Sequence, residues 1–281
     1  MIRRFFLLSS LIPAILCTPA LADDESSVIA HFEKAGARIT KNSDGHSIKL
    51  MSGGRPPHSL AELQSLKALS HLEELALNDP VAGDDDWDFL RNLPHLKKLT
   101  IWHCKTIQSL KPFSGLQIES LTVGGSMGLR DLNKENPGDH LNAVLTLTDL
   151  PNLKSVNLYH TPLLPHDEHL AHLASEFPTL EEVKIDCTAP RGFEIAITPA
   201  GLAELGKLPL KLLSIENISF FTDEHVRAIA GIKTLEVLLI DSRRVPFDTS
   251  NLETVLAKTR PDIEIQIARE GAKAPPTRSR K

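Results

Sequence analysis

A serine near the middle of the sequence lies in a pattern that hydrolases use for their nucleophile. Residues 124–128 read GGSMG and directly follow a short apolar segment that ends at Val123. The pattern G-x-S-x-G places a serine on a sharp turn between a strand and a helix, within reach of a histidine and an acid. Ser126, with a histidine such as His160, could then hydrolyse an ester or a peptide. The residues that follow, GLRDLNKENPGDH, have weak helical character, so a glycine-rich loop is the simpler interpretation.

A histidine-rich segment, HTPLLPHDEHLAHL, has the residue types of a metal site. It contains His160, His166, His169 and His172. Histidines three positions apart on a helix are neighbours and can share one zinc or copper ion. The spacing differs from HExxH, the zinc pattern of metalloproteases, and the apolar positions 170, 173 and 177 define the buried face of this helix. We therefore expect His169 and His172 to face solvent, and we predict no bound metal or other cofactor.

Four aspartates between residues 84 and 88 resemble part of a calcium loop. Asp84, Asp85, Asp86 and Asp88 lack the alternating order, the glycine and the terminal glutamate of such a loop. Carboxylates at the start of a helix interact favourably with the helix dipole. The run therefore predicts a helix start ahead of the apolar residues 87, 89 and 90 rather than a calcium site.

The elements that position these residues are indicated by an apolar pattern, LxxLxL, that recurs eight times. The copies begin at Leu72, Leu96, Ile118, Leu153, Leu180, Leu210, Leu235 and Ile263, and the last is truncated. The first seven begin 22 to 35 residues apart, a spacing typical of leucine-rich repeats. Apolar and polar residues alternate inside each copy, which predicts a short strand with one buried face.

Helix start signals lie between most of these strands. They are the capping boxes Ser59–Glu62 and Ser250–Glu253, Thr198 followed by Pro199, and Thr222 followed by two acidic residues. Consecutive strands that are joined by helices must be parallel. The sequence thus predicts an α/β fold, a leucine-rich repeat solenoid with parallel strands on its concave face and helices on its convex face.

The phase of the strands predicts which side chains point away from the core onto the concave face. The binding residues predicted on this face are Lys98, Trp102, Asn157, Tyr159, Glu182, Lys184 and Asp186. Trp102 and the single tyrosine, Tyr159, are notable because only 5% of the residues are aromatic, and such side chains dominate interface energetics. Alternatively, these two rings cover the sheet beneath the excursion at residues 124–147, which lengthens the third interval.

Residues 23–55 do not follow the repeat and predict a capping segment. SSVIAHFEKAGARI indicates an amphipathic helix, and TKNSDGHSIKL indicates a hairpin around Asp44 and Gly45. With repeats such as TDEHVRAIAGIKTLEVLLID, this arrangement resembles exported bacterial leucine-rich repeat proteins of the ribonuclease-inhibitor-like, cysteine-containing subclass. The resemblance covers residues 28–267 and implies the fold. It implies no reaction, because such families share no catalytic residues.

The two ends of the chain predict export. Residues 1–22, MIRRFFLLSSLIPAILCTPALA, combine two arginines, a short apolar run and a small-residue cleavage pattern, as in a secretory signal peptide. We expect a secreted or periplasmic protein without membrane insertion. The formal charge is −5, and loss of the two arginines makes the mature chain −7, which disfavours nucleic acid as a partner. The basic, proline-rich residues 268–281 are predicted to be disordered.

Two cysteines, Cys104 and Cys187, remain after removal of residues 1–22. They belong to repeats three units apart, which is on the order of 14 Å at the usual spacing of strands and is beyond the reach of a disulfide. Both are therefore predicted to be unpaired, buried and structural.

The predicted organisation is a signal peptide (1–22), a capping segment (23–55), the repeat solenoid (56–267) and a basic tail (268–281). The predicted function is non-enzymatic: an exported scaffold that binds a protein or peptide on its concave sheet. Two alternatives stay open, a serine hydrolase that uses Ser126 and a metal-binding surface protein that uses the histidines from His160 to His172.

Overall fold

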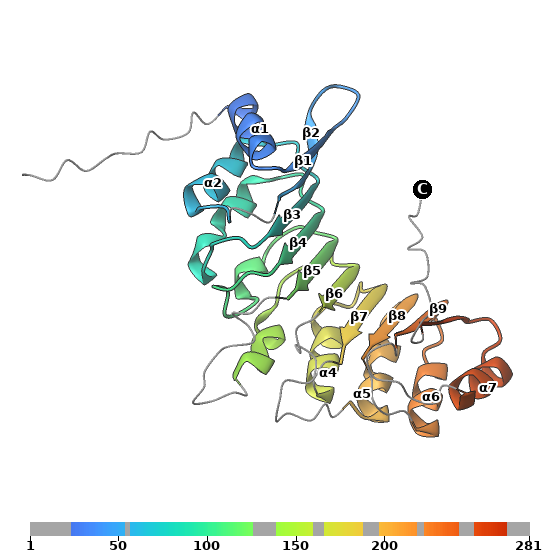
Figure 1. Ribbon diagram of the computed structural model, residues 1–281. Helices are drawn as coiled ribbons and strands as arrows, with labels where there is room; N and C mark the ends of the chain where they lie inside the picture. Colours follow the sequence, from blue (N-terminus) through green and yellow to red (C-terminus); the bar gives the residue numbers. More distant parts are fainter. Residues whose placement is uncertain are drawn as a thin grey trace, which may run out of the picture.

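The computed structural model describes residues 24–53, 57–125, 139–159, 166–187, 197–217, 222–241 and 250–268. Within these ranges the chain is an α/β protein with one ten-stranded sheet flanked by helices. The strands lie in chain order from β1 to β10. β1 and β2 are antiparallel, and every later pair of neighbours is parallel. Figure 1 shows the strands as a ladder with helices α2 and α4 to α7 along one side.

The strands are short and follow the predicted alternation. They are β1 (Arg38–Lys41), β2 (Ser47–Met51), β3 (Glu74–Asn78), β4 (Lys98–Trp102), β5 (Ser120–Gly124), β6 (Ser155–Tyr159), β7 (Glu182–Asp186), β8 (Leu212–Glu216), β9 (Val237–Asp241) and β10 (Glu264–Ala268). In β4, Leu99 and Ile101 are buried, whereas Lys98, Thr100 and Trp102 are not. Each strand from β3 to β9 contains the last two apolar residues of one predicted copy of the pattern.

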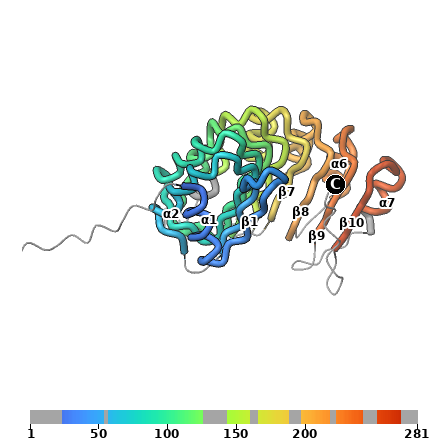
Figure 2. The backbone as a smooth tube through the Cα atoms, turned by 90° about the horizontal axis from the view of Figure 1, so that it is seen from above, coloured from blue at the N-terminus to red at the C-terminus, as the bar shows by residue number. Residues whose placement is uncertain are grey.

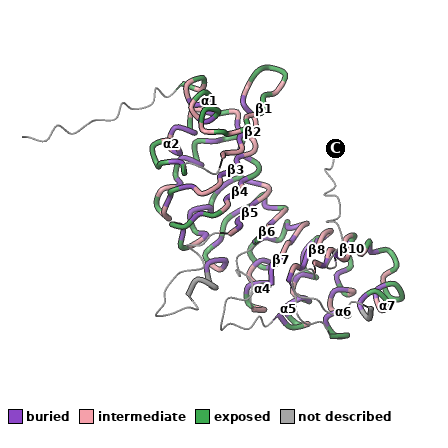
Figure 3. Tube along the Cα trace, viewed as in Figure 1, coloured by how far each residue is buried: buried purple, intermediate pink, exposed green. Residues whose placement is uncertain are grey.

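Successive strands pair without offset, so equivalent residues lie beside one another. Leu99, for example, lies between Leu75 and Leu121. These apolar columns pack against the helical side of the sheet and form one continuous buried cluster. Figure 3 shows the buried residues running along the strands and the adjoining helical segments. Each fully buried leucine contributes about 1.5–3 kcal/mol, which is what holds such a ladder together.

The helical segments are of two kinds. The α-helices are α1 (Glu25–Lys34), α2 (Leu60–Ser65), α4 (Asp167–Glu176), α5 (Pro199–Glu204), α6 (Asp223–Ala230) and α7 (Ser250–Thr259). The 3₁₀ segments are η1 (Leu66–Ala68), η2 (Asp84–Asp86), η3 (Asp88–Asn92), η4 (Lys111–Phe113), η5 (Asp139–Thr146) and η6 (Leu205–Lys207). The predicted caps are confirmed for three helices, since Ser59 with Glu62, Thr198 and Thr222 cap α2, α5 and α6.

The connections between β3 and β6 differ from the α-helices expected there, because their described helical segments are all 3₁₀. Pro112 lies inside η4, and Gly83 directly precedes η2. Both residues lie at the start of their segments, where proline and glycine are compatible with a helix, so they do not explain the 3₁₀ form.

The first end of the ladder is covered by α1 and by the predicted hairpin β1–β2. Val28, Ile29 and Phe32 of α1 are buried. His31 Nε2 lies 2.6 Å from Glu62 Oε1, and the Ser59 amide donates to Glu62 Oε2 at 2.6 Å. Burial of Glu62 works to raise the pKa of its carboxyl, but these hydrogen bonds together hold that pKa below its ordinary value.

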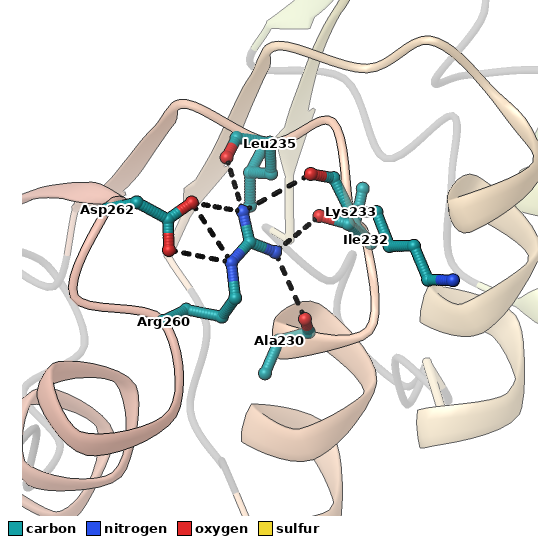
Figure 4. Close-up of polar contacts among 6 residues, drawn as sticks. All are labelled: Ala230, Ile232, Lys233, Leu235, Arg260 and Asp262. Atoms are coloured by element: carbon teal, nitrogen blue, oxygen red, sulfur yellow. Dashed lines mark hydrogen bonds and ion pairs between the residues drawn. The ribbon is translucent and has the colours of Figure 1, made fainter.

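At the other end of the sheet, Arg260 directly follows α7 and holds this end together through hydrogen bonds. Its guanidinium donates to the carbonyls of Ala230 (3.2 Å), Ile232 (2.9 Å), Lys233 (3.4 Å) and Leu235 (3.0 Å), as Figure 4 shows. Arg260 Nη2 also lies 2.7 Å from Asp262 Oδ2, and this hydrogen bond raises the pKa of Arg260. The end of α7 is thereby fixed to the loop that precedes β9.

Candidate functional site on the open face of the sheet

The side of the sheet that faces away from the helices is the candidate binding surface, which we call the open face. Each strand from β3 to β9 contributes its first, third and fifth residue to it. Most of these side chains are at least partly accessible, while Gly124, Asp186 and Ser214 are buried. Figure 2 shows the same ladder from above.

Six of the seven predicted binding residues are accessible on the open face. Lys98 and Tyr159 are exposed, and Trp102, Asn157, Glu182 and Lys184 are partly exposed. The phase of the strands therefore placed them correctly, although their role in binding stays a prediction.

Asp186 is a correction, because it is only 3% exposed. The Asn217 side chain donates from Nδ2 to Asp186 Oδ1 at 2.8 Å. Asn217 follows β8 in the left-handed backbone region, with φ 57°, a conformation that asparagine tolerates better than most residues. Strand phase predicts the side of the sheet but cannot foresee a side chain that arrives from the next turn.

A row of polar side chains runs across the middle of the open face. The in-register pairing places Thr100, Thr122, Asn157, Lys184 and Ser214 side by side. Neighbouring strands are ~4.8 Å apart, so this row offers a hydrogen-bonding group at each step. Among the described residues Lys184 makes no ion pair within 4 Å.

Two aromatic side chains meet over a glycine at one edge of this face. Gly124 pairs with Trp102 on one side and with Tyr159 on the other. A Cβ at residue 124 would lie 2.9 Å from Trp102 Cδ1 and 3.2 Å from Tyr159 Cδ1. Both rings therefore border the space that a side chain at residue 124 would occupy. We call Trp102 and Tyr159 the aromatic pair.

His103 adds a third ring beside the aromatic pair. Its Nδ1 lies 2.7 Å from Asn78 Oδ1, and its ring rests against Gly125, where a Cβ would come within 2.8 Å. His103 and Gly125 both follow their strands in the left-handed region, with φ 56° and 57°. The two glycines of the hydrolase-like pattern thus leave room for three neighbouring rings.

Ion pairs join the charges on the first strands of the open face, with two lysines around one glutamate. Glu74 lies between Lys49 and Lys98, with nitrogen–oxygen distances of 2.7 and 2.9 Å. Burial works to raise the pKa of Glu74, but the two lysines outweigh it and lower that pKa.

Both cysteines are free and buried, as predicted. Cys104 Sγ lies 3.5 Å from the carbonyl oxygens of Pro80 and Ala82, so it satisfies the backbone of the preceding turn. Burial, reinforced by the charges of Asp186 and Glu216, raises the pKa of Cys187 to about 12. The raised pKa of Cys187 is the opposite of what a reactive cysteine needs, and burial shields both thiols from reagents.

The histidine segment does not have the predicted exposure. His169 is 1% exposed, and His172 Nε2 lies 2.8 Å from the carbonyl oxygen of Leu147. His169 is therefore buried rather than exposed, and the partly exposed His172 contacts the preceding connection. Within the described ranges, no three histidine, cysteine, aspartate or glutamate side chains are grouped as metal ligands. His160 lies outside those ranges.

The structure does not test the serine-hydrolase alternative, since Ser126 and His160 both lie outside the described residues. The same holds for residues 126–138 of the predicted excursion, for the predicted signal peptide and for residues 269–281 of the predicted tail. The short helical piece expected near residues 141–147 is confirmed as the 3₁₀ segment η5.

The aspartate run starts η2 and η3, as expected. Asp84 also forms hydrogen bonds with the next connection. Asp84 accepts hydrogen bonds from the Gln108 amide (2.7 Å) and the Ser109 hydroxyl (2.7 Å) of the next connection. Asp167 at the start of α4 binds the Thr198 amide (2.8 Å) and hydroxyl (2.6 Å) in the same way. These carboxylates link neighbouring connections.

Sequence reasoning missed two features at the opposite edge of the sheet, where the strands begin. The rings of His46 and His71 stack at 3.8 Å, and those of His71 and His95 lie parallel at 5.9 Å. Directly before each strand from β3 to β9, glutamate and lysine alternate: Glu73, Lys97, Glu119, Lys154, Glu181, Lys211 and Glu236. Three pairs of this series form ion pairs, at 2.8 Å (Glu73–Lys97), 3.0 Å (Glu119–Lys154) and 2.6 Å (Glu181–Lys211).

Comparisons with known proteins do not identify a family or a function for this site. No protein-family model matches the chain, and a search of curated proteins found no match. None of the helices in the described ranges has both the length and the apolar composition that crossing a membrane requires.

Proposed function

We propose that this protein is an exported leucine-rich repeat scaffold, secreted or periplasmic, that binds a protein or peptide on the open face. In this proposal the chain-ordered strands form the concave surface of a solenoid and the helical segments its convex surface. The aromatic pair is the observation that carries the proposal. Aromatic side chains at a surface are the most frequent anchors of protein interfaces.

Three properties of the open face support this role. Tyr159, 37% exposed, is one of only three large apolar side chains that are exposed among the described residues. The polar row from Thr100 to Ser214 lies beside the aromatic pair and can satisfy the backbone of an extended partner. A partner can also reach Trp102, because its side chain is partly exposed.

The test is capture of partners from the extracellular or envelope fraction with three baits. The first is the mature protein, and the second carries Trp102→Ala and Tyr159→Ala. The third carries Leu60→Ala and Val81→Ala, which remove the two other exposed apolar side chains, both away from the open face. We expect the same partner on the first and third baits and a loss of about tenfold or more on the second. Equal capture by all three baits would show that the open face is not the binding surface.

A further inference from the structure

A single buried histidine, His58, lies where the first end of the sheet is covered. We call residues 24–53, which contain α1, β1 and β2, the cap; Figure 1 shows it at the start of the ladder, next to α2. His58 is 1% exposed, and its ring centroid lies 4.8 Å from that of Phe32 on α1. The backbone of Gly53, at the end of the cap, hydrogen-bonds the same ring. His58 therefore joins the cap to the segment that begins α2.

The sequence around α2 explains why a histidine is buried at this position. Ser59 is the N-cap of α2 and forms a capping box with Glu62. The residue before an N-cap often packs back onto the helix in a hydrophobic staple, which normally uses an apolar side chain. In this chain that residue is His58, so a ring that can bind a proton occupies an apolar position.

Among the described residues, Nε2 of His58 has no hydrogen-bond partner. The carbonyl of Gly53 acts on the ring as an acceptor, so Nδ1 carries the proton of the neutral ring and Nε2 is an acceptor without a donor. A proton added to Nε2 would place a charge and an unpaired donor in a buried position, which costs free energy. The closed cap therefore favours the neutral ring.

The charged groups near His58 do not compensate for its burial. Glu62 on α2 favours the protonated ring, whereas His31 on α1 opposes it, and these two side chains already pair with each other at 2.6 Å. In the turn after β3, the charged residue Asp79 lies 3.2 Å from Lys105 Nζ. Burial has the largest effect and holds the pKa of His58 below its ordinary value of 6.5.

We propose that the cap is an acid-sensitive closure that opens when His58 takes up a proton. In the closed state the ring is buried against Phe32, and in the open state it is in water, where a proton binds readily. Val28 and Ile29 of α1 are buried together with Phe32 in the continuous apolar cluster. Because an end repeat without a cover exposes its apolar side, acid converts this end of the ladder from a covered to an apolar surface.

The direction of the pH dependence follows from the lowered pKa of His58. Above pH 6.5 the ring is neutral in both states, so the opening constant of the cap does not depend on it. As the pH falls below 6.5 toward the lowered value, the open state binds the proton first, and the opening constant rises by up to about tenfold for each pH unit. Glu62 keeps its charge in this range, because its pKa is lowered from 4.5.

Hydrogen exchange of the mature full-length protein at pH 7.5 and pH 5.5 tests the proposal. Protection of the cap is compared with protection of β8 and β9, after correction for the intrinsic exchange rate at each pH. Two variants, His58→Gln and His58→Phe, remove the titratable ring, and the phenylalanine keeps an aromatic contact with Phe32. The matched control is His95→Gln, because His95 is exposed. Circular dichroism confirms that each variant is folded.

In the unmodified protein, the opening constant of the cap should rise about tenfold between pH 7.5 and pH 5.5, while β8 and β9 keep their protection. In both His58 variants this ratio should be about one, whatever their stability at neutral pH, and His95→Gln should retain the tenfold ratio. The fluorescent dye ANS, which binds exposed apolar surface, should report the same opening at pH 5.5 in the unmodified protein and not in the His58 variants.

A ratio of about one in the unmodified protein, or a tenfold ratio retained in a folded His58 variant, would overturn the proposal. An even loss of protection along the sheet at pH 5.5 would indicate global unfolding and would also overturn it. The same holds for a loss that begins only below pH 4.5, which would assign the effect to carboxylates such as Glu62. None of these measurements uses a partner, so their outcome is independent of the capture experiment.

Discussion

Replacing Arg260 with alanine tests how the last part of the sheet is fastened. The variant removes the donor of two short hydrogen bonds, to the carbonyls of Ile232 (2.9 Å) and Leu235 (3.0 Å), in a part-buried place. At about 1–1.5 kcal/mol for each, these account for about 2–3 kcal/mol. Asp262 adds little, because solvent screens an ion pair whose acidic partner is 62% exposed.

The measurement is the free energy of unfolding in urea, with hydrogen exchange to locate the effect. Arg260→Lys should lose about half as much as Arg260→Ala, because an ammonium group cannot reach carbonyls on both sides. The matched control is Arg91→Ala, since Arg91 is half exposed and donates to one carbonyl, that of Ser114 at 3.1 Å. Arg91→Ala should lower the free energy of unfolding by less than about 0.5 kcal/mol.

Exchange in Arg260→Ala should rise in β9 and β10 and stay unchanged in β3 and β4, because β10 pairs only with β9 among the described strands. The reasoning is refuted if Arg260→Ala costs no more than Arg91→Ala, or if protection falls evenly along the sheet.

Three further predictions concern contacts away from the open face. Glu62→Gln should lower the melting temperature at neutral pH. The pKa of Glu62 is lowered in the folded state, so the contribution of its carboxylate is present above its ordinary pKa and is lost as the pH falls through the lowered value, and the difference in melting temperature should shrink over that range. Asp84→Ala should cost about 1–2 kcal/mol in urea unfolding, because three donors lose their acceptor, while Asp85→Ala next to it should cost less than about 0.5 kcal/mol. Native protein at pH 8 should show no reaction of Cys104 or Cys187 with a thiol reagent, and both should react after unfolding; fast labelling of the native protein would contradict their burial.

The strands and the side that each residue faces were predictable, because the alternation inside LxxLxL is a local property. Leu99 and Ile101 are buried and Trp102 lies outward for the same reason, a side-chain period of two residues. The cap of α5 at Thr198 was also readable, since a capping side chain binds an amide only two residues away.

Features that depend on register between distant segments were not predictable from one sequence. The burial of Asp186 needs Asn217, which is 31 residues away. The meeting of Trp102 and Tyr159 needs Gly124 between them in adjacent strands. His169 is buried because of where α4 packs, and no periodicity within α4 determines that.

One long-range feature did leave a signal in the sequence. The residue after the first apolar position of each copy alternates between glutamate and lysine from Glu73 to Glu236. Seven alternating charges at one repeat position have a simple explanation if consecutive strands are adjacent, because each charge then has an opposite charge beside it. The pattern could have supported the strand order before any coordinates.

The two edges of the open face therefore differ in what they leave for a partner. At the edge where the strands begin, ion pairs such as Glu119–Lys154 neutralise the alternating charges within the chain, and exposed pairs of this kind contribute to register more than to stability. At the edge where the strands end, the aromatic pair lies beside Gly124. A charged partner gains little at the first edge, because each cation there already has an anion beside it. Reversing Lys154 to glutamate should therefore weaken the fold while leaving capture of the partner by the open face unchanged, and a loss of capture would place the contact at the wrong edge.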